Sequence, residues 1–91
     1  MTRIAAETIT IDQAVETICI EAWDTEGGQA QGIIWDRTGQ DDQDGEWGTQ
    51  LIDWEGDLDD AVIAVEAAGF TVEEFVGHDI DGGGATALAR R

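Results

Sequence analysis

The chain of 91 residues is long enough for one small domain, and its apolar share of 42% is enough for a packed core. The chain has no Lys, Ser, Asn, Tyr or Pro, which excludes a serine nucleophile, a Schiff-base lysine and a tyrosine acid. Its formal net charge of −17 excludes a surface that attracts nucleic acid or anionic membrane. The single cysteine excludes an internal disulfide. The start at Met1–Ile4 has no apolar run, so no signal peptide is predicted, and no window is apolar enough for a membrane span. The expected location is therefore a cytoplasm.

The first quarter of the chain predicts a strand followed by a helix. Residues 2–10 alternate weakly and indicate a short strand. Thr10–Gln13 has the pattern of a capping box, and apolar residues follow at helical spacing, which predicts a helix over 11–24 that Gly27 and Gly28 would end. The alternative is a strand over Thr17–Trp23. β-Branched residues favour that strand, whereas the cap favours the helix, which we expect.

The middle of the chain predicts a long-looped hairpin. Gln29–Asp36 indicates a strand whose end is strongly apolar, and Arg37–Gly45 has the composition of a loop. Trp47–Trp54 alternates as a returning strand would.

The best-specified element is a helix over 58–68. Asp57 is a suitable N-cap, acidic residues follow in the first turn, and Gly69 stands where a helix ends. Residues 71–77 fit either a strand or a helical capping box, and we favour the strand because Gly69 has just closed a helix. Residues 79–84 indicate a glycine-rich turn, and Ala85–Ala89 predicts an edge strand.

These elements predict one α+β domain over residues 1–91. Their order is β-α-β-β-α-β, the ferredoxin-like order, in which one antiparallel sheet carries two helices on one face.

The acidic segment 36–60 is the strongest candidate for a functional surface. It holds ten of the twenty-one carboxylates and a single base, Arg37. With the tryptophan in its centre, the predicted partner-binding residues are Asp36, Asp41, Asp42, Asp44, Glu46, Trp47, Asp53, Glu55, Asp57, Asp59 and Asp60. Trp47 is expected to be an exposed anchor, because aromatic residues inside a polar rim are typical of interface hot spots. Trp23, Trp35 and Trp54 are expected in the core.

Other candidate sites fail on chemistry. Asp42–Gly45 resembles the middle of a calcium-binding loop, but Leu51 stands at the twelfth position, where a bidentate Glu is required. His78 beside Asp79 and Asp81 is expected at the surface, and Cys19 is expected to be a buried structural thiol on the helix over 11–24. The glycines at 82–84 lack the strand-to-helix setting and the lysine of a nucleotide loop. No catalytic residue, metal or cofactor is predicted.

The charge has three explanations. It can serve solubility alone, or adapt the protein to molar salt, as in haloarchaeal proteins rich in Asp and Glu. Clustering in 36–60 favours the third, nucleic-acid mimicry, in which carboxylates occupy a groove whose Arg and Lys side chains grip phosphates.

In size, acidity and lack of catalytic groups the chain resembles phage-encoded inhibitors such as anti-CRISPR and anti-restriction proteins. The resemblance is compositional and implies only a class. That class is a non-enzymatic protein that blocks the basic surface of a nucleoprotein defence complex in a host cytoplasm and contacts neither nucleic acid nor membrane directly. The alternative is an acidic domain of a salt-loving organism without a mimicry role.

Overall fold

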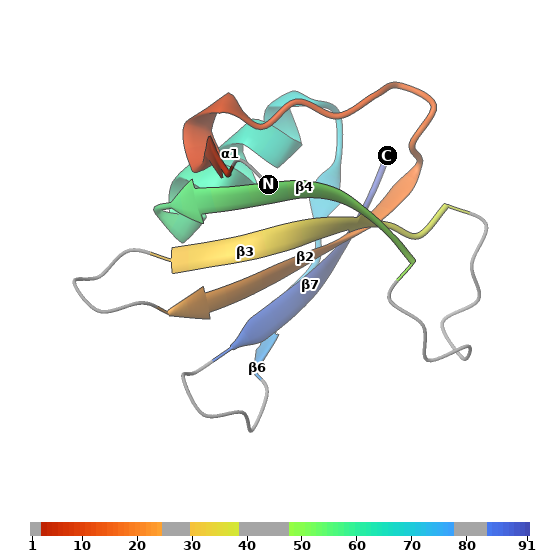
Figure 1. Ribbon diagram of the computed structural model, residues 1–91. Coiled ribbons are helices and arrows are strands. Elements are labelled where there is room, and N and C mark those ends of the chain that lie inside the picture. Colours follow the sequence, from red (N-terminus) through yellow and green to blue (C-terminus); the bar gives the residue numbers. More distant parts are fainter. Residues whose placement is uncertain (1–2, 25–29, 39–47, 78–83) are drawn as a thin grey trace.

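The computed structural model describes residues 3–24, 30–38, 48–77 and 84–91 of the chain (Figure 1). Within them lie seven short or medium strands, one 3-10 helix and one α-helix. In chain order these are β1 (Ile4–Ala5), η1 (Ala6–Thr8), β2 (Thr17–Asp24), β3 (Ala30–Asp36), β4 (Thr49–Gly56), α1 (Leu58–Ala67), β5 (Thr71–Val72), β6 (Val76–Gly77) and β7 (Ala85–Arg90). The α+β class is therefore confirmed. None of the helices in this part of the chain is long and apolar enough to cross a membrane.

All the strands belong to one mixed sheet. Six of them follow one another in the order β1-β4-β3-β2-β7-β5, and β6 pairs with β7 beside β5. Only the β1–β4 pair is parallel, and the other pairs are antiparallel. The predicted ferredoxin-like order with two helices is wrong, because a single α-helix is present among the described residues and β7 lies inside the sheet instead of at its edge.

The predicted helix over 11–24 is wrong, and the alternative strand is correct. β2 lies between β3 and β7, and its Ile18 and Ile20 are fully buried. The capping-box interpretation fails because Asp12 forms a local turn, in which its side chain accepts the N–H of Ala14 at 2.9 Å and its carbonyl accepts the N–H of Val15 at 3.0 Å. Such turns compete with helix initiation. Pairing on both sides then favours the β-branched strand.

The predicted strand over 2–10 is correct only for Ile4 and Ala5. These two residues pair in parallel with Trp54 and Glu55 of β4. The chain then turns through η1, whose last residue, Thr8, donates its hydroxyl to the carbonyl of Ala5 at 2.7 Å.

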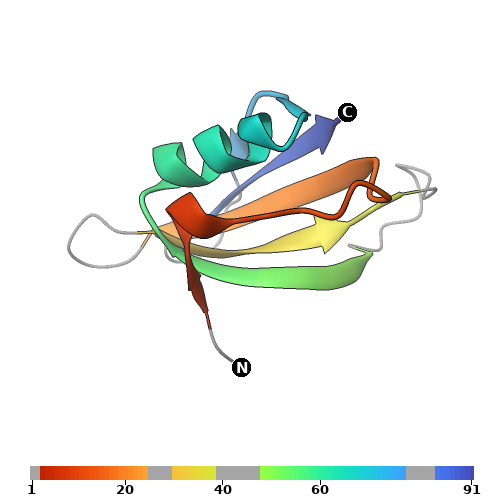
Figure 2. The same ribbon diagram turned by 90° about the horizontal axis from the view of Figure 1, so that it is seen from above.

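The helix predicted over 58–68 is confirmed as α1. Asp57 accepts the N–H of Asp59 at 2.9 Å as N-cap, and Gly69 follows the helix with a φ of +101°, a conformation that favours glycine. Ala61 and Val65 are fully buried against the sheet, whereas Ile63 is 63% exposed. Figure 2 shows α1 and η1 on the same side of the sheet, and the main core lies between them and that side.

The hairpin of β3 and β4 is confirmed, with the returning strand shifted to begin at Thr49. A register shift between Ile34 and Trp35 accompanies a backbone φ of +94° at Gly48. Residues 39–47, which include most of the predicted loop, lie outside the described residues. The strand favoured for 71–77 is present in two pieces, β5 and β6, which both pair with β7.

Candidate functional site

The structure describes six of the eleven predicted partner-binding residues. The other five, in the loop before β4, lie outside the described residues: Asp41, Asp42, Asp44, Glu46 and Trp47. The six described carboxylates follow β3, β4 and the start of α1: Asp36, Asp53, Glu55, Asp57, Asp59 and Asp60.

These six carboxylates do not form one surface. Asp36 pairs with Thr49 at one end of the β3–β4 hairpin, whereas Glu55 pairs with Gln31 at the other. Five residues of strand separate the two ends, which is about 17 Å. Asp36 accepts the N–H of Thr38 at 2.8 Å in a local turn. The carboxylates that are clustered in the sequence are thus divided in space, because Asp36 and Glu55 lie at opposite ends of the antiparallel hairpin.

A second group of carboxylates surrounds a hollow where β4 meets α1. The hollow has a volume of about 280 Å³. Four acidic residues from η1, the end of β4 and the start of α1 line it together with Ala5, Ala6 and Gly56: Glu7, Glu55, Asp57 and Asp60. We call this group the acidic hollow. Three of its four carboxylates belong to the predicted site, and Glu7 does not.

Glu7 reaches the acidic hollow through a contact between distant parts of the chain. The parallel pairing of Ile4 with Trp54 brings η1 beside the end of β4. The approach is close, since a Cβ added at Gly56 would lie 3.2 Å from the Cβ of Ala6, and the φ of +136° at Gly56 also favours glycine. No local pattern predicts a pairing across some fifty residues, so sequence reasoning missed Glu7.

The described residues that line the acidic hollow carry an excess of negative charge. Glu7, Glu55, Asp57 and Asp60 are all exposed, and the start of α1 adds the positive end of a helix dipole that favours anionic side chains there. No ion pair within the described ranges joins these four carboxylates to an arginine. The same ranges hold no group of three or more His, Cys, Asp or Glu side chains arranged to bind a metal ion. The hollow therefore suits the guanidinium or ammonium group of a partner's side chain.

The tryptophans divide between the two faces of the sheet. Trp54 is fully buried in the core, as predicted. The same prediction is wrong for Trp23 and Trp35, which lie half-buried on the face opposite α1. The indole N–H of Trp35 donates to the carboxylate of Glu21 on that face at 3.2 Å. The alternation of β2 and β3 would have placed both rings there had residues 17–24 been recognised as a strand.

Cys19 is buried, as predicted, but in β2 and not in a helix. It pairs with Trp35 on one side and Leu88 on the other, and it is 4% exposed. Burial raises the pKa of its thiol from 9.0 to about 11, although the nearby Arg37 guanidinium acts in the opposite direction and Glu21 adds to the rise. A protonated, shielded thiol is a poor nucleophile. His78, Asp79 and Asp81 lie outside the described residues.

We expect the raised pKa of Cys19 to make stability fall at high pH. Because the folded-state pKa lies above the unfolded one, the stabilisation is complete below about pH 9 and is lost as pH rises through about 11. The expected loss is about 2 kcal/mol. Urea unfolding at pH 8, 9.5 and 11 measures it cleanly, because the chain has no Lys or Tyr to titrate in this range. Cys19→Ala should remove the slope, and an unchanged slope in that variant would contradict the assignment.

Comparison with protein-family models, with curated proteins and with solved structures finds no match for this chain. The function is therefore inferred from the chemistry of its own surface. The acidic hollow is the best-defined charged feature of that surface, and the face of the sheet opposite α1 is the best-defined aromatic one.

Proposed function

We propose that this protein is a non-enzymatic binding protein whose acidic hollow receives basic side chains of a partner. The observation that supports this proposal is the convergence of four carboxylates from three elements on one hollow without an arginine of the described chain to neutralise them. The one cysteine of the chain, Cys19, is buried and protonated, so it does not offer an activated thiolate nucleophile.

The partner of such a surface is basic. Proteins that grip nucleic acid present Arg and Lys side chains spaced to contact phosphates. A domain of charge −17 that adds a local group of carboxylates can occupy the same side chains and exclude the nucleic acid. This mode of action agrees with the compositional resemblance to phage-encoded anti-CRISPR and anti-restriction inhibitors. We therefore propose inhibition of a nucleic-acid-binding defence complex, with cytoplasmic action, as the function.

The alternative is an acidic domain of a salt-loving organism, and two observations favour it. Exposed carboxylates also lie away from the hollow on the described surface: Asp12, Glu16, Glu66, Glu73 and Glu74. The hairpin also separates the two ends of segment 36–60, so its carboxylates are less clustered in space than in sequence, which weakens the argument for mimicry. On this alternative the total charge matters, and the position of each carboxylate does not.

Neutralising the acidic hollow should weaken binding to a basic groove. The variant combines Glu7→Gln, Glu55→Gln, Asp57→Asn and Asp60→Asn, and the Asn at position 57 preserves the N-cap. Displacement of labelled duplex from purified CRISPR effector–guide complexes and restriction endonucleases is followed by fluorescence anisotropy. For an effector that the natural protein displaces from DNA, we expect about a 50-fold loss of inhibition, since each lost ion pair at an interface costs a fraction to a few kcal/mol.

A matched control removes the same number of charges elsewhere. It combines Asp12→Asn, Glu16→Gln, Glu66→Gln and Glu74→Gln. Inhibition should be retained within about threefold in this control, and inhibition by the natural protein should weaken as salt rises. Equal losses in the two variants would favour a dispersed charge effect, and failure to displace DNA from any effector would refute the inhibitor proposal.

A further inference from the structure

The face of the sheet opposite α1, which we call the open face, has no described helix packed on it (Figure 2). Paired residues of neighbouring strands point to the same side. The register therefore places Trp23, Ile33, Trp35 and Leu88 on the open face, all half-buried. The two tryptophans lie near opposite ends of the β2–β3 pair, with Ile33 between them. Such a sheet face is unusual for a surface that meets only water, since exposed apolar patches commonly mark interfaces.

Among the described residues, arginines and carboxylates are nearest to balance on the open face. Alternation and register place three of the four arginines on it or at its border: Arg3, Arg37 and Arg90. Four carboxylates share the face or its border with them: Glu21, Asp53, Glu55 and Glu73. Of these, Glu73 forms an ion pair with Arg90 at 3.7 Å, and Glu55 also lines the acidic hollow. The described side chains of this face therefore carry a net charge of only −1, in a chain whose total is −17.

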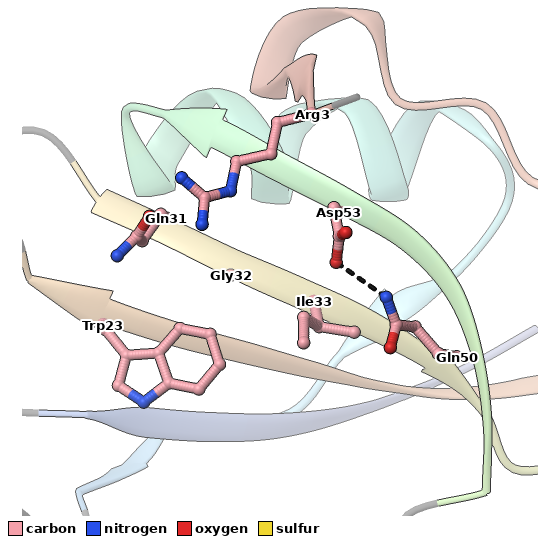
Figure 3. A pocket seen from close by; sticks show the side chains of 7 residues that line it. All are labelled: Arg3, Trp23, Gln31, Gly32, Ile33, Gln50 and Asp53. Atoms are coloured by element: carbon pink, nitrogen blue, oxygen red, sulfur yellow. Dashed lines mark hydrogen bonds between the residues drawn. The ribbon is translucent and has the colours of Figure 1, made fainter. Parts of the chain in front are cut away.

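The centre of the open face is hollowed. A depression of about 330 Å³ lies beside Trp23 and Ile33. Figure 3 shows Arg3 reaching across β4 toward Gln31 at its rim, with Asp53 and Gln50 on the opposite side. The amide of Gln50 donates to Asp53 at 2.8 Å, which holds that carboxylate beside the apolar floor. Gly32 contributes backbone to the floor of the depression.

We propose that the occupant of the open face is a second copy of this chain, which packs its own open face against it. Two molecules of charge −17 repel each other over most of their surfaces. On the open face, within the described surface, three arginines lie among four carboxylates, so a two-fold arrangement can place basic groups of each copy beside acidic groups of the other. Packing of sheets face to face would bury the tryptophans and leave α1 on the outside of the dimer.

The size of the open face sets the strength of this dimer. Five strands at about 4.8 Å spacing and seven residues along β2 give roughly 400 Å² per copy. That is about half of a standard interface, so we expect a dissociation constant on the order of 10⁻⁵ to 10⁻⁴ M. Added salt should tighten the dimer, because it screens the repulsion between the two net charges. Binding at the acidic hollow has the opposite salt dependence, which separates the two proposals.

Sedimentation equilibrium between about 10 µM and about 1 mM tests the dimer. The chain mass of 9.8 kDa should rise toward twice that value, more steeply at about 0.5 M than at about 0.05 M KCl. Ile33→Glu places a charge in the centre of the face and should raise the dissociation constant at least about tenfold. Trp23→Ala, which adds no charge, should weaken the dimer in the same direction.

The control is Ile63→Glu, which adds the same charge at a side chain of α1 that is 63% exposed. Its dissociation constant should equal that of the natural protein. Circular dichroism of each variant verifies the fold. A natural protein that stays monomeric at about 1 mM overturns the proposal, as do Ile33→Glu and Trp23→Ala variants that dimerise like the natural protein.

Discussion

Replacing Gly32 by alanine is expected to unfold the protein. A Cβ at this position of β3 would lie at a sub-contact distance from the carbonyl oxygen of Glu21 on β2 and 2.7 Å from the ring of Trp54. The carbonyl belongs to the sheet and cannot rotate away, and the ring is fully buried. β3 would have to move away from both β2 and the Trp54 ring. We expect a loss of about 4 kcal/mol or more, which is a large part of the stability of a small domain.

Urea unfolding followed by circular dichroism measures this loss. The matched control is Gln31→Ala, the neighbouring position of β3, whose side chain lies on the rim of the depression in the open face (Figure 3). It should change stability by less than about 1 kcal/mol. If Gly32→Ala retained the stability of the natural protein within that margin, β3 could not pack against Trp54 as closely as the structure shows.

The position of Gly32 explains how much of the fold was predictable. The strand itself was predicted from its composition, and α1 was predicted nearly to its ends, because Asp57 and Gly69 act within one turn of the helix. Contacts within a few residues leave a pattern that the sequence displays. The glycine has no such pattern, because the atoms that exclude a side chain there come from two other strands.

The failure over residues 11–24 has the same origin. Ile18 and Ala22 satisfy a helical spacing as well as a strand alternation, so local pattern could not decide between a helix and a strand. Pairing with β3 on one side and β7 on the other decided for the strand. Once that strand is placed, Trp23 and Trp35 fall on the open face and not in the core. One wrong element thus concealed the aromatic surface completely.

The acidic hollow was predictable in part for a related reason. Glu55, Asp57 and Asp60 lie close together in sequence and in space, since a strand ends and a helix begins there. Glu7 joins them only through the parallel pairing of β1 with β4. Asp36 leaves the group because a hairpin carries it to the other end of the sheet. Closeness in sequence therefore predicted charge density well and surface shape poorly.

A single arginine joins the C-terminal end of the chain to the turn at residues 12–15 and to the end of α1, and no sequence pattern indicates it. The guanidinium of Arg91 donates to the carbonyl of Val15 at 2.7 Å, to that of Asp12 at 2.9 Å and to that of Ala68 at the end of α1. It also lies 4.4 Å from the centre of the Phe70 ring. A cation at the carboxyl end of a helix is favoured by the helix dipole, and the ring adds a cation–π contact.

We expect Arg91→Met to lower the free energy of unfolding by about 3 kcal/mol, because three charge-assisted hydrogen bonds to carbonyls are lost and only part of that loss is recovered by water. Arg91→Lys should restore little of it, since one ammonium group cannot reach three carbonyls that diverge as these do.

Arg90→Met is the matched control. The ion pair of Arg90 with Glu73 spans 3.7 Å between half-exposed side chains, so its loss should lower the free energy of unfolding by less than about 1 kcal/mol. Urea unfolding of the three variants measures these differences. Equal losses at positions 90 and 91 would mean that removing a positive charge from an acidic protein matters more than these hydrogen bonds.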